Sequence, residues 1–311
     1  MDKSINISFE NFLVDIMNNR INTVSNLFRI KKGCASKKRI TELLKLILSK
    51  NLKIKSINLS NCHVTLENLR MISNIPDLVS LNLHNSINIV IPNQKTLFDE
   101  EISKLSKLVL LDISSNNNFK KPYKIVENMK NLKILSMENL FETFEKDKPN
   151  LKFSNLSKLE ELDVSNNCLT FDELNEISKL SNLYLLYYSG IYNIKCKNSK
   201  TMIEIIDKIN EKIFNLKNLE FFDCSSYNIR IDNKEIIKET NQDEKLVWTS
   251  NINYVVAETI IKLIINLPKL KELNFLINKT KKITINIKNT SVTMNENIFN
   301  QMIQSNLMNL L

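Results

Sequence analysis

The sequence predicts an α/β solenoid, in which short parallel strands and helices alternate along a curved, horseshoe-shaped stack. Two observations predict it: a strand-like pattern that recurs through most of the 311 residues, and helix-like segments between its copies. A third observation argues against a competing class of fold. The chain has only two glycines, Gly33 and Gly190, whereas the phosphate-binding loops of nucleotide-binding folds need several.

The recurring pattern is clearest in LEELDVSNNCLT, which starts at Leu159 and has apolar residues at positions one, four and six and asparagine at position nine. Eight copies are recognisable, starting at Ile54, Leu78, Leu108, Leu132, Leu159, Leu183, Leu219 and Leu270. A ninth, from Ile283, fits only in part. Successive starts lie 24, 30, 24, 27, 24, 36 and 51 residues apart, so the last two intervals imply insertions near 192–210 and 231–255.

Helix-like segments precede several of the copies, at residues 65–77, 97–107, 171–182, 202–218 and 255–269. Each has apolar residues three or four positions apart, which places them on one face of a helix. Repetition of strand, turn and helix should put the strands on a concave side and the helices on a convex side.

Over about residues 52–295 these copies resemble the leucine-rich repeat family, in its intracellular ribonuclease-inhibitor-like form or its short 24-residue form. Cys62 stands at position nine, where some intracellular members carry cysteine in place of asparagine. Leu140, Ile191 and Tyr227 depart from the pattern there, so the hydrogen bonds of the turn must be broken or replaced. The resemblance implies a non-catalytic protein-binding scaffold. The alternative is a regulator: a GTPase activator, a phosphatase regulator or a ubiquitin-ligase substrate receptor.

The predicted organisation is an N-terminal helical cap at 1–50, a solenoid at 51–295 and a C-terminal capping helix at 296–311. The cap should contain helices near 8–19 and 38–50, because solenoids need their end repeats covered. A recruitment module of the F-box type is the alternative for 1–50, although its Leu-Pro opening is absent.

Side chains alternate along a strand, so positions one, four and six should face the core and positions three, five and seven the concave surface. At position six, Tyr188 and Cys224 are therefore predicted to be buried. The outward positions combine carboxylates with aromatic and apolar residues, in a chain of net charge +9. The predicted partner-binding residues are Tyr184, Tyr187, Phe221, Asp112, Asp163, Asp223 and Glu161.

Exposed aromatic side chains are typical of protein interfaces, and the carboxylates favour a protein partner with a basic or mixed surface. The alternative is that the acidic residues only keep the solenoid soluble and that an insertion covers Tyr187. The basic run Arg29–Arg39 could contact nucleic acid, but it has no interleaved aromatic residues and is interpreted as a solvated loop.

No secretory signal, 18-residue apolar run or Cys-x-x-Cys pair is present, and the five cysteines are an odd number. We therefore expect a monomer in the cytoplasm or nucleus, without a membrane span. Ser60, His84 and Asp112 could approach a Ser–His–Asp arrangement, but no oxyanion hole is evident. Cys62 and His63 are adjacent and should point apart. The sequence therefore predicts no enzyme activity, catalytic residue, metal or cofactor.

Overall fold

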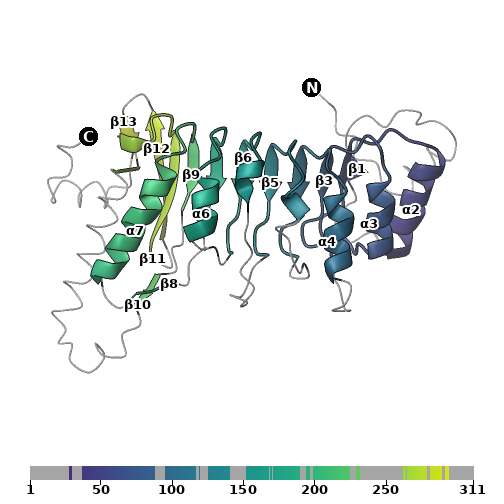
Figure 1. Ribbon diagram of the computed structural model, residues 1–311, viewed down its shortest axis with the longest axis horizontal. Helices are drawn as coiled ribbons and strands as arrows, with labels where there is room; N and C mark the ends of the chain where they lie inside the picture. The colour runs from purple at the N-terminus through teal and green to yellow at the C-terminus, as the bar shows by residue number, and fades with distance from the viewer. Residues whose placement is uncertain are drawn as a thin grey trace. The chain divides into compact units, whose positions relative to one another are not determined.

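A computed structural model describes residues 28–29, 37–87, 95–116, 119, 125–140, 152–167, 169, 171–189, 194–196, 199–224, 229–231, 262–263, 265–278, 281–288 and 291–293. The chain divides into two compact units, Met1–Leu159 and Glu160–Leu311. Figure 1 labels their helices and strands. Four predicted features lie wholly or mostly outside the described residues: the helix at 8–19, the Arg29–Arg39 run, the insertion near 231–255 and the C-terminal capping helix.

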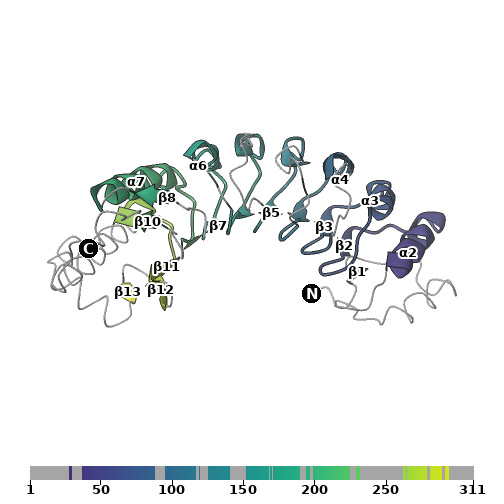
Figure 2. The ribbon, with the colours of Figure 1, turned by 90° about the horizontal axis from the view of Figure 1, so that it is seen from below.

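In the first unit each copy of the sequence pattern has one short strand, and one further strand, which the pattern did not predict, lies within the predicted N-terminal cap. The strands β1 (Phe28–Arg29), β2 (Ser56–Asn58), β3 (Ser80–Asn82), β4 (Leu110–Asp112) and β5 (Ile134–Ser136) are neighbours in this order, and every neighbouring pair is parallel. The helices α2 (Lys37–Ser49), α3 (Leu66–Ser73) and α4 (Lys95–Ser103) lie on one side of the strands (Figure 2), and a short 3-10 helix, η2, spans Phe153–Asn155. The predicted solenoid fold is confirmed.

The second unit repeats the arrangement. Its parallel strands are β6 (Glu161–Asp163), β7 (Leu185–Tyr187), β9 (Phe221–Asp223) and β11 (Glu272–Asn278), with α6 (Phe171–Ile177) and α7 (Ser199–Ile213) on one side. Within the predicted insertion at 192–210, β8 (Ile194–Cys196) pairs in parallel with β10 (Ile229–Ile231) as a separate two-stranded sheet. The predicted insertion at 192–210 also contains the first residues of α7.

The partial ninth copy, from Ile283, is not a further parallel repeat. It falls in β12 (Lys281–Lys288), which pairs antiparallel with β11, and β13 (Ser291–Thr293) pairs antiparallel with β12. Only residues 279–280 separate β11 from β12. A parallel neighbour needs a crossover of about a dozen residues or more, so this connection permits only a hairpin.

The core lies between strands and helices and is built from positions one, four and six. At position four, for example, Ile57, Leu81, Leu111 and Leu135 are 0–1% exposed. Burial of each such side chain contributes about 1.5–3 kcal/mol. Tyr188 and Cys224 are each 1% exposed, which confirms the prediction that they are buried.

Position nine ties neighbouring repeats together through buried hydrogen bonds. The Asn116 side-chain amide donates to the carbonyl oxygens of Leu83 (2.9 Å) and Ile113 (2.7 Å). Its Oδ1 accepts from the backbone N–H groups of Ser86 (2.9 Å) and Ile87 (2.8 Å). One side chain therefore satisfies polar groups in two successive repeats.

Where asparagine is missing at position nine, a hydroxyl can replace it. The Ser86 hydroxyl donates to the carbonyl of His84 at 2.9 Å and accepts from the backbone N–H of Cys62 at 3.4 Å. Leu140 is instead buried, at 8% exposure, and supplies an apolar contact. The other two departures, Ile191 and Tyr227, lie outside the described residues.

Position eight has a conformational requirement that was not predicted from the sequence, although asparagine recurs there. Its residues have positive φ, between 48° and 57°, at Asn61, Asn85, Ser115, Asn139 and Asn166. Asparagine visits this left-handed region more readily than other side-chain-bearing residues, because its short amide bonds locally. The frequent asparagines of the turns therefore follow from backbone geometry.

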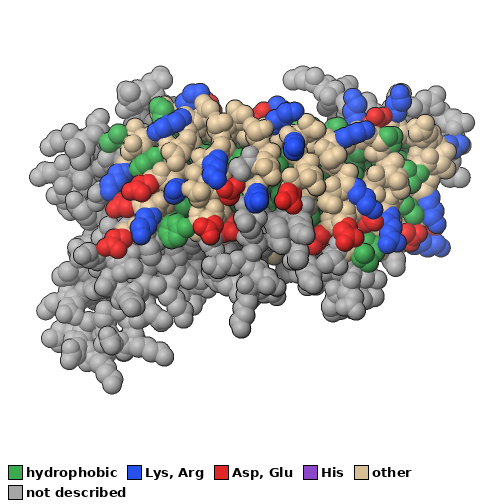
Figure 3. Space-filling model, in the orientation of Figure 1, with side chains coloured by type: hydrophobic (Ala, Val, Ile, Leu, Met, Phe, Trp, Pro, Cys, Tyr) green, Lys and Arg blue, Asp and Glu red, His purple; other side chains and the backbone are tan. Residues whose placement is uncertain are grey.

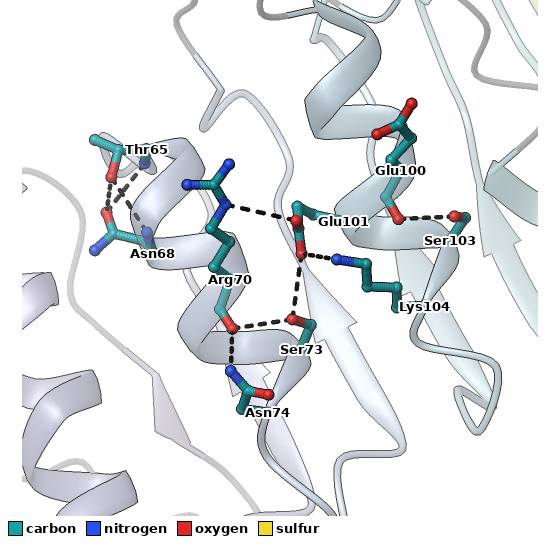
Figure 4. A network of polar contacts seen from close by, with 9 residues as sticks. All are labelled: Thr65, Asn68, Arg70, Ser73, Asn74, Glu100, Glu101, Ser103 and Lys104. Carbon is teal, nitrogen blue, oxygen red and sulfur yellow. Dashed lines mark hydrogen bonds and ion pairs between the residues drawn. The ribbon is translucent and has the colours of Figure 1, made fainter.

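Polar contacts join two helices of the first unit (Figure 4). Thr65 caps α3: its hydroxyl accepts from the backbone N–H of Asn68, whose side chain accepts from the Thr65 N–H. The Glu101 carboxylate of α4 forms ion pairs with Arg70 of α3, at 3.5 Å, and with Lys104, at 2.8 Å. Since Glu101 is only 9% exposed, these two cations compensate a largely desolvated charge.

Candidate functional site on the strand face of the second unit

Positions three and five of four neighbouring strands, with position two just before each strand, form one surface, which we call the strand face. The paired register aligns Glu161, Leu185, Phe221 and Glu272 at position three. At position five the same register aligns Asp163, Tyr187, Asp223 and Asn274. Neighbouring strands lie about 4.8 Å apart, so each of these residues is beside the next. Alternation turns both positions away from the buried residue between them.

The centre of the strand face is aromatic. The Tyr187 and Phe221 rings, on adjacent strands, have centroids 5.0 Å apart and planes tilted by 53°. Both residues, and Leu185 beside them, are half-buried. A tilted ring pair at this distance stabilises its own geometry by about 0.5–1.5 kcal/mol beyond burial. The rings are thus held in place before any partner arrives.

Carboxylates surround this centre. The Tyr184 hydroxyl donates a hydrogen bond to Oε1 of Glu161. This bond, with partial burial and the charges of Glu161, Glu160 and Glu220, raises the pKa of Tyr184 to about 12. Partial burial also raises the pKa of Tyr187, and so, to a lesser degree, do the charges of Asp163, Asp223, Glu161 and Glu272.

One cation lies beside these carboxylates: the Lys271 amine is 2.7 Å from Oε2 of Glu220. The pair is substantially exposed, at 68% and 39% for the two side chains, and is therefore weak. In the described part of the second unit, positions two, three and five carry more carboxylates than this one lysine can balance. They are Glu160, Glu161, Asp163, Glu220, Asp223 and Glu272. The strand face is therefore acidic.

Two of the predicted carboxylates have a structural task. Oδ1 of Asp163 accepts from the backbone N–H of Ser165 at 3.0 Å, and Oδ1 of Asp112 accepts from that of Ser114 at 3.0 Å. An aspartate or asparagine at position five thus closes the turn two residues later. Oδ2 of Asp112 also accepts from the Asn82 amide at 2.8 Å.

The structure gathers six of the seven predicted residues in one unit, but not all are equally accessible. Tyr184, Tyr187, Phe221, Glu161 and Asp163 are half-buried, whereas Asp223 is only 5% exposed. Asp223 thus differs from the expectation that it points freely outward, and it acts on the surface through its charge. Asp112 belongs to the first unit. Glu272, which sequence reasoning did not select, joins the set, because the register aligns it with Phe221.

The described contacts do not form the Ser–His–Asp arrangement considered above. No hydrogen bond between described side chains joins the His84 ring to Ser60 or Asp112; the Asp112 carboxylate binds Asn82 and Ser114 instead. Within the described ranges, no group of three or more His, Cys, Asp or Glu is placed to hold a metal ion. Nor does any described helix have the length and apolar character needed to cross a membrane.

No protein-family model matches the chain, and no curated protein matches it. Similar solved structures include internalin C2 of Listeria monocytogenes, at 15% identity and TM-score 0.41, covering 69% of this chain and 76% of that one. Another internalin of the same species has 16% identity and TM-score 0.38, covering 78% and 62%. A leucine-rich repeat protein of Leptospira interrogans has 20% identity and TM-score 0.38, covering 68% and 56%.

The repeat itself identifies the type of protein. Within each unit the copies place one short strand in parallel register with the next. In five copies the turn passes through a left-handed residue at position eight, and in the copies from Leu108 and Leu159 an asparagine at position nine closes the turn. Helices return the chain on the other side of the strands. This repeat unit gives the chain a fold of the leucine-rich repeat type.

Proposed function

We propose that the chain is a non-catalytic interaction scaffold whose strand face in the second unit binds a protein with a basic or mixed surface. The observation that carries this proposal is the Tyr187–Phe221 ring pair, half-buried and surrounded by carboxylates. Aromatic side chains with one accessible side are the usual anchors of protein interfaces. Carboxylates around them favour approach by a positively charged surface.

The strand face is suited to binding because its side chains are already ordered. The Tyr184 hydroxyl is held by Glu161, the two rings hold each other, and Asp163 is fixed by the Ser165 backbone. Ordering a mobile side chain on association costs about 0.5–1.5 kcal/mol, so groups ordered beforehand bind with less loss of entropy.

The helix side offers no comparable concentration of one charge. There, acidic and basic side chains are interspersed over the described surface (Figure 3). Charged side chains on this side also form ion pairs with one another, as Glu101 does with Arg70 and Lys104. This contrast supports the strand face as the binding surface.

A comparison of three baits tests the proposal. The full chain, a strand-face variant (Phe221→Ala with Glu220→Lys) and a control (Ile134→Ala with Lys133→Glu) are each used to capture proteins from lysate. The control changes positions three and two of the copy from Leu132, which correspond to the positions of Phe221 and Glu220 in the copy from Leu219. Circular dichroism and thermal unfolding establish that all three baits are folded.

A partner retained by the full chain and the control, but lost from the strand-face variant, is the expected result. Equal retention by all three folded baits would remove the strand face from the proposal. If the captured protein is a GTPase, a turnover assay with the full chain then separates a passive scaffold from a GTPase activator.

A further inference from the structure

We infer that the strand face recognises arginine side chains of its partner, holding a guanidinium against the Tyr187 and Phe221 rings and the carboxylates beside them. This inference rests on the function proposed above and specifies the chemistry of the partner. It is carried by the position of the two rings relative to the charges.

Each ring has a carboxylate on a neighbouring strand in paired register. Tyr187 lies between Asp163 of β6 and Asp223 of β9. Phe221 is aligned with Glu272 of β11. Because neighbouring strands are about 4.8 Å apart, a cation lying over a ring is within one strand spacing of a carboxylate. A ring and the half-buried carboxylate of Asp163 or Glu272 can therefore contact the same cationic group, whereas Asp223, at 5% exposure, attracts it only through its charge.

A guanidinium fits this combination better than an ammonium does. It is planar and weakly hydrated, it stacks on aromatic faces, and its N–H groups can bind a carboxylate through two parallel hydrogen bonds. Attraction of a cation to a ring within about 6 Å adds to the carboxylate interaction. A lysine amine gains the charge interaction but loses more hydration and cannot stack.

Other partners fit the strand face less well. An apolar segment would cover the rings but would also take the carboxylates of Glu161 and Glu272 further out of water, which is unfavourable. A polyanion would be repelled by the same groups. The raised pKa of Tyr187, caused first by burial and then by Asp163, Asp223, Glu161 and Glu272, is consistent with a neutral ring in a negative field.

The equivalent positions of the first unit lack this combination. Aligned at position three of β4 and β5 are Leu110 and Ile134, and aligned at position five are Asp112 and Ser136. No aromatic ring occurs at these four positions, and Asp112 is the one carboxylate among them. Arginine recognition is accordingly assigned to the second unit.

Three peptides test the inference with the full chain, by fluorescence anisotropy. They share one Gly/Ser backbone and differ only at three positions, which hold arginine, lysine or neutral citrulline. The arginine peptide should bind about 3- to 10-fold more tightly than the lysine peptide, as expected for an added ring contact. The citrulline peptide should bind least, since it has lost its charge.

Two variants separate the rings from the charge. Tyr187→Leu with Phe221→Leu keeps an apolar surface and should bring the arginine and lysine affinities within about twofold of each other. Glu161→Gln with Glu272→Gln should weaken both peptides together, because both depend on the carboxylates. Ile134→Leu, in the first unit, should change neither affinity.

Equal affinity for the arginine and lysine peptides would overturn the inference, and so would an arginine preference that survives in the leucine variant. Absence of binding by all three peptides would overturn it as well. None of these outcomes decides the proposed function, because loss of a captured partner from the Phe221→Ala, Glu220→Lys bait is measured independently of the peptides.

Discussion

The exposed strand positions of the two units differ far more than their buried ones. Position four carries Ile57, Leu81, Leu111 and Leu135 in the first unit and Leu162, Leu186, Phe222 and Leu273 in the second, all at most 1% exposed. Position five carries Asn58, Asn82, Asp112 and Ser136 in the first unit but Asp163, Tyr187 and Asp223 on β6, β7 and β9. The same repeat therefore supports a polar surface in one unit and an acidic, aromatic one in the other.

This difference separates two roles of a repeat residue. Positions one, four, six, eight and nine meet requirements of packing, hydrogen bonding or backbone conformation in both units. Positions two and three can vary once those requirements are met, and position five varies in part, because an aspartate or asparagine there also bonds the turn. Binding specificity is consequently to be sought at the positions where the units differ.

The largest expected effect is on the shared framework. Asn116→Ala removes the acceptor of the Ser86 and Ile87 N–H groups and the donor to the Leu83 and Ile113 carbonyls, at a site 2% exposed. We expect unfolding free energy to fall by about 3 kcal/mol, because buried polar groups lose their partners. Urea unfolding measures it. As a control, Asn131→Ala, at an exposed amide, should change stability little; equal effects would contradict the assigned role of position nine.

A smaller effect is expected from the turn at position eight. Asn85 has φ 48°, so a β-branched valine there should destabilise the first unit by about 1–2 kcal/mol. Asn85→Gly also loses the side-chain bond to Asn61 but tolerates the conformation, and it should stay near the parent. Thermal unfolding of the two variants isolates the backbone requirement, which would be refuted if both lost the same stability.

The aromatic pair offers a direct comparison of the two surfaces. A double-mutant cycle on Tyr187 and Phe221, each changed to alanine, should give a coupling of about 1 kcal/mol. The corresponding cycle on Leu110 and Ile134, aligned across β4 and β5, should give a smaller value, since neither residue has a ring. Chemical unfolding of all variants supplies both couplings. A coupling near zero for Tyr187 and Phe221 would mean that the rings are not held together.

The smallest effect concerns a single proton. The pKa of Tyr184 is raised from 10.0 to about 12 in the folded chain, first by its hydrogen bond to Glu161. Its contribution to stability is therefore present below pH 10 and is lost as the pH rises from about 10 through about 12. Glu161→Ala should move this ionisation back toward 10, as followed by ultraviolet absorbance of the phenolate. An unchanged titration in Glu161→Ala would contradict the hydrogen bond.

Much of the fold was predictable because it follows from short-range regularities. Alternation of side chains along a strand predicted the buried rows, including Tyr188 and Cys224 at position six. The spacing of the copies predicted one strand for each repeat. The left-handed turn had a signal that was missed: asparagine recurs at position eight, at Asn61, Asn85, Asn139 and Asn166.

The sequence by itself determined the repeat, its buried positions and the gathering of Tyr184, Tyr187, Phe221 and Glu161 on neighbouring strands. Only the tertiary structure decided which outward residues are accessible and what they bind. Asp223 became nearly buried, and Asp163 and Asp112 were engaged by backbone N–H groups. The reason is physical: a strand pattern fixes the direction of a side chain, whereas exposure and hydrogen bonding depend on neighbours that are distant in sequence.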